Sequence, residues 1–538
     1  MQENDILKEL RIPGLEHGPH ADECMENTRQ NILAEIQQWC SDVSAPNILW
    51  LKGYPGVGKS AIAASLVKQL RASTRLGSYF FFQRQRAAEM TPSALWRTVA
   101  YDLARAHLTV RRHLVAKLKE KEIDLSTVNI TDLFRNLIHE PLVASQDIPS
   151  ERLPVVVLDA LDECGGLAGQ HSDHRKRLMQ TLEMWSQLPS KFKLVISSRD
   201  ERDIKRVFSR TRHDIIDIPA GQTVDSQSSN DIRVFLEDQF EQMTGEYETL
   251  PPGWPGPQII QDLSGKADGL FIWAKTVVSF ISQRTPKRRL EAVLSGGGLG
   301  TVETLSGMES RNMGTLYSQI LASSFHQQSP GELKAFRSLV GTVIRADGTL
   351  TLSSIAQLLS IDDEMVEHVF RGLQSVMDYH DILRFNHQSF VDFLLNPVAC
   401  PPEFRVDVKQ VDAELSLRCL TTMTTTLKFN ICELESSYLS NVEVRDLKER
   451  IRQEISGALQ YSCIHWSRHL CSDWDPTCVD IEEALDKFLK GEWPLYWLEV
   501  LSVMEKVPAG IRTLRQVKAC PKVSVYYQLE KIQLTGIN

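Results

Sequence analysis

The sequence predicts an α/β fold in which a parallel sheet is covered by helices, followed by all-α regions. Three observations lead to this fold class. Short apolar runs alternate with amphipathic segments from about residue 47 to residue 220, a glycine-rich motif follows the first run, and the strand signal nearly disappears after residue 220. At roughly 100–200 residues per domain, a chain of 538 residues has room for about three or four domains.

Five apolar runs are the expected strands of the sheet. Continuous apolar runs are typical of strands buried on both faces, as in a parallel sheet between helices. Directly after the first run, Ile62, Leu66 and Leu70 recur at helical spacing and predict an amphipathic helix. The predicted strands lie at 48–51, 79–82, 155–158, 194–196 and 215–218.

Beyond the sheet the pattern is helical. Helices are predicted at 228–243, 257–264 and 270–284, and the glycine-rich stretch 295–300 indicates a flexible joint. Two short helices around Ile355 and Val366, followed by a strand pair around Ile382–Phe385, resemble a winged helix. The expected segments are a lead-in helix and linker (1–45), a sheet domain (46–220), a helical lid domain (221–295), a winged-helix-like domain (296–396) and a C-terminal helical domain (397–538).

Composition and charge exclude several classes of protein. With 42% hydrophobic and 24% charged residues, the chain is neither disordered nor a collagen or coiled-coil rod. The net charge of −9 gives no overall attraction to nucleic acid, so nucleic acid is not an expected partner. The polar first ten residues lack a secretory signal, and the apolar stretch 269–281 is too short to span a membrane, which favours a cytoplasmic protein with no transmembrane segment.

The most specific signal is a match to G-x-x-x-x-G-K-[ST] between the first predicted strand and its helix. In such a loop, glycines let backbone N–H groups surround phosphate oxygens, and the helix N-terminus adds its positive dipole end. Lys59 would neutralise the distal phosphates, and Ser60 would bind Mg²⁺. The residues predicted to bind a nucleotide here are Gly53, Tyr54, Pro55, Gly56, Val57, Gly58, Lys59, Ser60 and Ala61.

Two further strands end in charged residues. Asp159 ends the run 155–158 and is the natural second ligand of Mg²⁺, while Glu163 would polarise the attacking water and Asp162 would share that role or hold metal-bound waters. Arg199 follows the run 194–196 and would contact the terminal phosphate. The alternatives are that the acids cap the following turn and that Arg199 forms a surface ion pair with Asp200 or Glu201.

The ten cysteines are expected to be reduced thiols. Cys463, His465, His469 and Cys471 are residue types that bind zinc. On a helix His465 and His469 share a face, but Cys463 falls on another side, so ordinary helix packing is the preferred interpretation.

With these motifs the sequence resembles the NACHT-type P-loop NTPases of the STAND class, particularly the fungal NOD-like receptor proteins. The resemblance extends to Gly269–Ala274, to His387–Leu394, and to the lead-in before Arg29, where Asn27 replaces the glycine common in the family. It implies that residues 46–220 form a NACHT nucleotide-binding domain. The family usually has a C-terminal repeat sensor, and we expect this chain to be a form that lacks it.

The resemblance also implies a function. A nucleoside diphosphate would hold a closed form, and exchange for ATP or GTP with Mg²⁺ would open the chain to form a homo-oligomer in signalling of the fungal non-self-recognition or cell-death type. Thr28 and Arg29 would line the base or ribose side, and His387 would face the diphosphate or instead be a packed core histidine. Lys59, Asp159, Asp162, Glu163 and Arg199 would serve slow hydrolysis to ADP or GDP.

Three other functions are alternatives to this one. The first is a scaffold or regulatory protein that binds nucleotide without hydrolysing it. The second is a transcription factor that uses the winged helix, although the candidate recognition helix at 362–368 opens with acids that would repel DNA. The third is a P-loop kinase, which would not explain the long helical region after the sheet.

Overall fold

The computed structural model describes residues 3–19, 21–125, 127, 129–145, 148, 153–166, 171–283, 285–295, 308–325, 329–348, 350–379, 383–436, 438–470 and 479–519. The chain divides into two compact units, Met1–Leu299 with Leu305–Leu316, and Gly300–Thr304 with Tyr317–Asn538. The predicted joint at 295–300 lies outside the described residues after Ser295. The predicted boundaries between smaller segments remain predictions.

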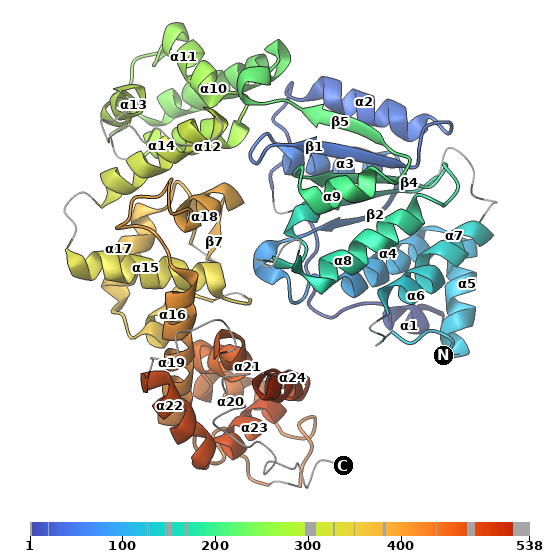
Figure 1. The fold of residues 1–538 in the computed structure, drawn as a ribbon, viewed down its shortest axis with the longest axis vertical. Helices are drawn as coiled ribbons and strands as arrows, with labels where there is room; N and C mark the ends of the chain where they lie inside the picture. Colours follow the sequence, from blue (N-terminus) through green and yellow to red (C-terminus); the bar gives the residue numbers. More distant parts are fainter. Residues whose placement is uncertain are drawn as a thin grey trace. The chain divides into compact units, whose positions relative to one another are not determined.

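The first unit contains the predicted parallel sheet (Figure 1). Its strands are β1 (Ile48–Gly53), β2 (Leu76–Phe81), β3 (Val155–Asp159), β4 (Lys193–Ser198) and β5 (Asp214–Ile218). The order is β2-β3-β4-β1-β5, and every neighbouring pair is parallel. β4 therefore lies between β1 and β3, so the segments that follow these three strands meet at one edge of the sheet.

All five predicted strands are present, and β2 differs most from its prediction. It begins at Leu76 and ends at Phe81, whereas the apolar run covers residues 79–82. Gly77 and Ser78 belong to the strand although neither is apolar. A Cβ on Gly77 would lie 2.7 Å from the Cβ of Pro154, so the close approach of the two backbones requires glycine here.

Helices pack on both sides of this sheet. α3 contacts β1 to β4, and α4 contacts β2. Trp96 lies at the centre of the core on the α4 side, with ring centroids 4.7 Å from Phe134 and 6.0 Å from Trp185. The helices are α1 (Glu3–Lys8), α2 (Gln30–Ser41), α3 (Lys59–Ala72), α4 (Pro92–Ala106), α5 (Leu108–Lys119), α6 (Ile130–Phe134), α7 (Glu140–Ala144), α8 (Asp173–Trp185) and α9 (Arg202–Phe208).

The helices of the predicted helical lid domain, here called the helical lid, follow β5 in the same unit. It comprises α10 (Ser226–Glu246), α11 (Pro257–Ala267), α12 (Phe271–Ile281) and α13 (Pro286–Ser295), and α14 (Met308–Ser324) comes next. α10 begins after Asp225, whose carboxylate accepts a hydrogen bond from the Ser228 N–H. The three helices predicted here are present, with ends shifted by a few residues.

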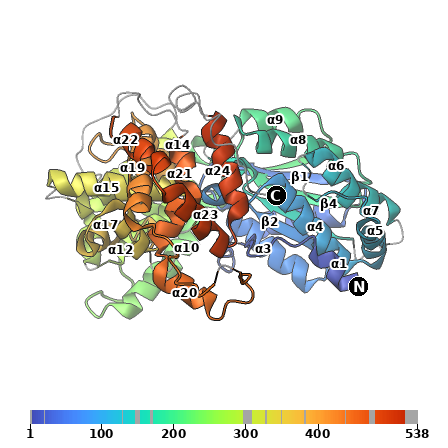
Figure 2. The same cartoon turned by 90° about the horizontal axis from the view of Figure 1, so that it is seen from below.

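The second unit is helical apart from a short hairpin, β6 (Met377–Asp378) and β7 (Arg384–Phe385), whose strands are antiparallel. The predicted pair of short helices precedes this hairpin as α16 and α17. Figure 2 shows the later helices of this unit from below, where α19 packs against α21 and α22. The helices are α15 (Pro330–Arg345), α16 (Leu352–Leu359), α17 (Asp363–Gly372), α18 (Gln388–Leu395), α19 (Val408–Thr426), α20 (Leu447–Glu454), α21 (Gly457–Leu470), α22 (Val479–Lys490), α23 (Trp493–Val503) and α24 (Val507–Ala519).

The two histidines of the suspected zinc cluster contact other side chains. The rings of His465 and Tyr461 have centroids 4.8 Å apart. His469 Nδ1 lies 3.0 Å from an Asp412 oxygen, and its Nε2 lies 2.8 Å from the Tyr461 hydroxyl. Cys471 lies outside the described residues. Within the described ranges, no group of three His, Cys, Asp or Glu side chains could hold a metal ion. This supports helix packing.

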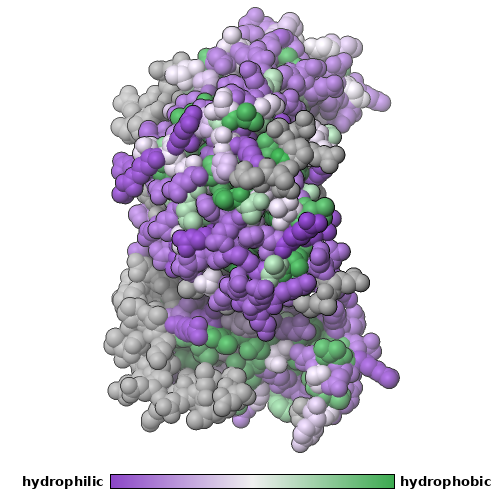
Figure 3. All heavy atoms as spheres, turned by 90° about the vertical axis from the view of Figure 1, so that its right-hand side faces the viewer, coloured by the Kyte–Doolittle hydropathy of each residue, from purple (hydrophilic) through white to green (hydrophobic). Residues whose placement is uncertain are grey.

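The described cysteines Cys24, Cys40, Cys164, Cys400, Cys419, Cys432 and Cys463 are free thiols. None of the helices in the described ranges has the length and hydrophobicity that a membrane-spanning segment needs. The face shown in Figure 3 is mostly hydrophilic, with hydrophobic side chains in separate small groups.

Candidate functional site

The glycine-rich loop Gly53–Ser60, here called the phosphate loop, joins β1 to α3, as the motif requires. A Cβ on Gly53 would lie 3.0 Å from both the Ile218 carbonyl oxygen and the Val57 Cγ2, so the first glycine is needed for close packing. Gly58 has φ 98° and is the N-cap of α3. Because Gly58 has no side chain to cap the helix, the N–H groups of its first turn suit an anion such as phosphate.

Lys59 begins α3 and folds back over the loop. Its Nζ donates to the carbonyls of Gly53 and Tyr54, at 2.8 and 2.9 Å. Burial lowers the pKa of Lys59 to about 8, although the nearby carboxylate of Asp162 acts in the opposite direction. The ammonium is thus held within the loop and close to the acids that follow β3.

Asp159 ends β3 and is fully buried. The Ser197 hydroxyl on β4 donates to Asp159 Oδ1 and accepts a hydrogen bond of 3.1 Å from the Ala160 N–H. β4 therefore fixes the carboxylate on its neighbouring strand. A serine hydroxyl at the start of α3, Ser60, and a carboxylate at the end of β3 are the oxygen ligands that suit Mg²⁺.

Asp162 and Arg199 form an ion pair at the same edge. The Arg199 backbone N–H donates to Asp162 Oδ1 at 3.0 Å, and Nε lies 3.1 Å from Oδ2. The side chain of Asp162 is only 5% exposed and that of Arg199 19%. Glu201, one of the two acids in the alternative interpretation of Arg199, accepts a hydrogen bond from Arg175 at 2.7 Å. The structure therefore joins two of the predicted site residues directly.

Glu163 has a different environment. Its Oε2 accepts a hydrogen bond of 3.0 Å from the Arg84 backbone N–H. Burial, assisted by the negative charge of Asp162, raises the pKa of Glu163 to about 7, and the Arg84 guanidinium opposes this rise. A carboxylate with a pKa near neutrality suits a general base. Arg84 was not among the predicted site residues, although Arg84 follows β2, a strand that ends at this same edge.

Arg29 is a buried residue between the phosphate loop and the helical lid. Its Nη1 donates to the Ser228 hydroxyl at 2.7 Å, its Nη2 to the Val57 carbonyl at 2.8 Å, and its backbone N–H to Asp231 Oδ2 at 3.0 Å. Asn27, two residues earlier, has φ 65°, which explains why asparagine takes the place of the family's glycine.

α12 of the helical lid reaches the loop as well. The guanidinium of Arg29 lies 4.9 Å from the centre of the Phe271 ring, and the Ile272 N–H donates to the Gly56 carbonyl at 3.0 Å. Neither Ser228 nor Asp231 was a predicted site residue. Each lies about 200 positions from Arg29 in the chain, so no local pattern links them.

His387 belongs to the second unit and is the N-cap of α18. Its Nδ1 accepts a hydrogen bond of 3.1 Å from the Ser389 N–H and lies 2.7 Å from the Ser389 hydroxyl. These contacts give His387 a local role at the start of a helix. Its role toward a nucleotide stays a prediction.

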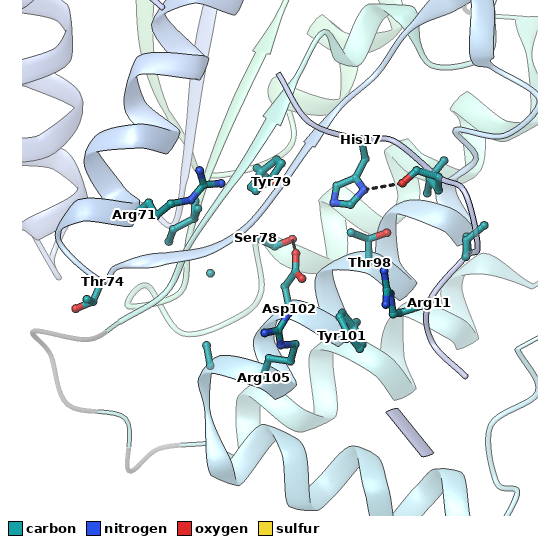
Figure 4. Close-up of a pocket in the computed structure, with 15 residues that line it drawn as sticks. Arg11, His17, Arg71, Thr74, Ser78, Tyr79, Thr98, Tyr101, Asp102 and Arg105 are labelled. Atoms are coloured by element: carbon teal, nitrogen blue, oxygen red, sulfur yellow. Dashed lines mark hydrogen bonds between the residues drawn. The ribbon is translucent and has the colours of Figure 1, made fainter. Parts of the chain in front are cut away.

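A separate pocket of about 590 Å³ opens beside the first half of β2 (Figure 4). Arg11 and Arg105 lie 5.7 and 5.8 Å from the Tyr101 ring centre. The Ser78 hydroxyl donates to Asp102 at 2.7 Å, and burial raises the pKa of Asp102. The pocket is distinct from the phosphate edge because it lies along the start of a strand whose other end faces that edge.

The comparisons with known proteins agree with this geometry. A family model described as Nephrocystin 3, N-terminal, matches residues 27–199, a range that begins just before Arg29 and ends at Arg199. The vegetative incompatibility protein HET-E-1 of Podospora anserina is 23% identical over 517 residues. This match covers 90% of the present chain and 35% of that protein. The chain is a relative of the NACHT-type STAND NTPases.

The chain thus spans about a third of the length of this curated relative. Among solved structures, a STAND protein with a tetratricopeptide repeat sensor from Pyrococcus horikoshii is 12% identical, with a TM-score of 0.40. The matched region covers 95% of the present chain and 67% of the Pyrococcus chain. The match to a DNA replication initiation factor covers 91% of the present chain and 98% of that factor's chain, at 9% identity and a TM-score of 0.24. The family model and HET-E-1 confirm the family resemblance, and the parallel sheet with its helices confirms the α/β plus helical fold class.

Proposed function

We propose that the chain is a nucleotide-dependent switch that binds ATP or GTP with Mg²⁺ and hydrolyses it slowly. The observation that carries this proposal is the meeting, at one edge of the sheet, of the phosphate loop and the charged residues that follow β3 and β4. A protein of this kind would open and form homo-oligomers in cytoplasmic signalling, of the fungal non-self-recognition or cell-death type. The match to a vegetative incompatibility protein supports that setting.

Each site residue would have its own role in binding or hydrolysis. The N–H groups at the start of α3 and the Lys59 ammonium would bind the phosphates, and Ser60 with Asp159 would hold Mg²⁺. Mg²⁺ would supply charge neutralisation at the phosphoryl oxygens. Glu163 would accept the proton of the attacking water. Arg199, held beside the loop by Asp162, would provide positive charge toward the terminal phosphate.

The first test is to extract and identify the nucleotide from purified protein. The mass of the protein in solution, measured on the same sample, reports whether it forms oligomers. Lys59→Ala should abolish nucleotide binding, whereas Lys68→Ala should not. Lys68 lies on the same helix, is 70% exposed and pairs with Glu23, which makes it a matched control. Retained affinity in the Lys59 variant would overturn the assignment of this loop.

Hydrolysis needs a separate measurement. Glu163→Gln should retain binding and slow single-turnover hydrolysis by about 10²-fold or more, the usual contribution of a general base. Unchanged hydrolysis would remove Glu163 from the mechanism. Tight binding by the unaltered protein, without hydrolysis above that of free nucleotide, would favour the scaffold alternative instead.

A further inference from the structure

Two successive carbonyls of the phosphate loop are bonded to groups outside the loop. The Gly56 carbonyl accepts from the Ile272 N–H at 3.0 Å, and the Val57 carbonyl accepts from Arg29 Nη2 at 2.8 Å. Ile272 belongs to the helical lid, and Arg29 is itself bonded to the lid through Ser228 and Asp231. Both bonds therefore lead from the phosphate loop to the lid.

These bonds fix the orientation of peptide planes. In a planar trans peptide the C=O and the following N–H point in opposite directions. A hydrogen bond that holds the Val57 carbonyl toward Arg29 therefore turns the Gly58 N–H to the opposite side. Gly56 and Gly58, at φ 87° and 98°, flank this segment, and glycine allows many backbone conformations. The loop depends on such outside bonds to keep its N–H groups directed toward a phosphate.

Arg29 has little freedom of its own. Its side chain is 3% exposed and packs over the Phe271 ring. Its φ of 56° is a left-handed conformation that an arginine rarely adopts, so the surrounding contacts must hold it there. Asp231 bonds the backbone N–H of Arg29 and places a negative charge near its guanidinium, while the Ser228 hydroxyl bonds the guanidinium directly. A buried guanidinium that loses this hydroxyl and this charge would be costly, and Arg29 would move.

We propose that Arg29 is a positioning residue through which the helical lid controls the phosphate loop. When α10 is docked, Ser228 and Asp231 hold Arg29, Arg29 holds the Val57 carbonyl, and the loop is set to receive phosphate. When α10 moves away, the loop loses this bond and its affinity for the nucleotide falls. Coupling between two sites is reciprocal, so bound phosphate also favours docking of the lid. The inference rests on the proposed function for the identity of the ligand, and it gives Arg29 a role through the loop, not at the base or ribose.

The test changes residues of the lid that do not belong to the loop. Ser228→Ala and Arg29→Lys should each raise the Kd for a fluorescent ADP analogue by about 5- to 150-fold, the usual range of coupling between sites. Ser226→Ala, in the exposed first turn of the same helix, is the matched control and should bind as the unaltered protein does. Ser228 acts on the loop only through Arg29. The double variant Arg29→Ala/Ser228→Ala should therefore weaken nucleotide binding no more than Arg29→Ala alone.

Hydrogen exchange separates this proposal from the proposed function. In nucleotide-free protein, Ser228→Ala and Arg29→Lys should speed amide exchange at residues 56–60, whether or not the nucleotide assignment is correct. Unaltered exchange at the loop, or additive effects of the two substitutions on Kd, would overturn the coupling. Failure of the unaltered protein to bind any nucleotide would instead refute the proposed function. The exchange result would still decide whether Arg29 couples the helical lid to the loop.

Discussion

Glu163 should make the stability of the nucleotide-free protein depend on pH. Folding raises its pKa from 4.5 to about 7, mainly through burial. Between these values the native state binds more protons than the unfolded state, so the free energy of unfolding falls as the pH rises. At 1.36 kcal/mol per pH unit the full effect is about 3 kcal/mol, and partial exposure of the side chain reduces it to about 2–3 kcal/mol.

The substitution that removes this effect is Glu163→Gln. The amide stays neutral and its oxygen can still accept from the Arg84 N–H. At about pH 8 the variant should be more stable than the unaltered protein by about 2–3 kcal/mol, which corresponds to about 5–10 °C in Tm for a domain of this size. At about pH 5 the difference should shrink to less than about 1 kcal/mol, because the buried carboxyl is then protonated.

Thermal unfolding in chelator, after removal of nucleotide, measures both values. Glu89→Gln is the control, since Glu89 is 54% exposed and its surface pair with Arg86 is worth less than about 1 kcal/mol. A Tm gain of the same size at both pH values would show that burial of the charge is not its cause. A loss of stability at about pH 8 would refute the reasoning entirely.

Two more substitutions test buried polar contacts, one beside Asp159 and one in the second unit. Ser197→Ala removes the hydroxyl that bonds Asp159 and the Ala160 N–H, so the Mg²⁺ concentration needed for half-maximal nucleotide binding should rise; an unchanged requirement would separate Asp159 from the metal. Asp412→Ala, in the second unit, leaves Arg345 and His469 without their shared acid and should cost about 3–5 kcal/mol of stability by denaturant unfolding. A cost below about 1 kcal/mol would mean that the network adds little.

Local patterns predicted the sheet and its loop because their signals are contiguous in the chain. Buried parallel strands produce apolar runs, and the phosphate loop has a fixed spacing between β1 and α3. The pattern failed at β2, where Ser78 pairs with Val156 of β3 and Gly77 lies at a shift in the register, and neither contributes an apolar side chain. Strand pairing there is decided by the neighbouring backbone, which hydrophobicity alone does not report.

The partners of the site residues could not be predicted in the same way. Arg29 bonds to Ser228 and Asp231, which lie 199 and 202 positions later in the chain, and His469 bonds to Asp412, which lies 57 positions earlier. In both cases the sequence suggested a ligand for a polar residue that the fold supplies with a protein partner. A buried arginine or histidine needs such a partner, but its own neighbourhood in the chain does not say which residue provides it.

The same limit explains why the motif alone left two candidates for the general base. Asp162 and Glu163 are adjacent in the sequence, and either could follow a metal-binding aspartate. In the structure both oxygens of Asp162 are engaged by Arg199, one through the backbone N–H and one through the guanidinium. Glu163 accepts from the Arg84 backbone N–H through one oxygen, and its raised pKa leaves it ready to exchange a proton near neutrality. Partners on the segments after β2 and β4 therefore favour Glu163 as the base and Asp162 as the residue that positions Arg199.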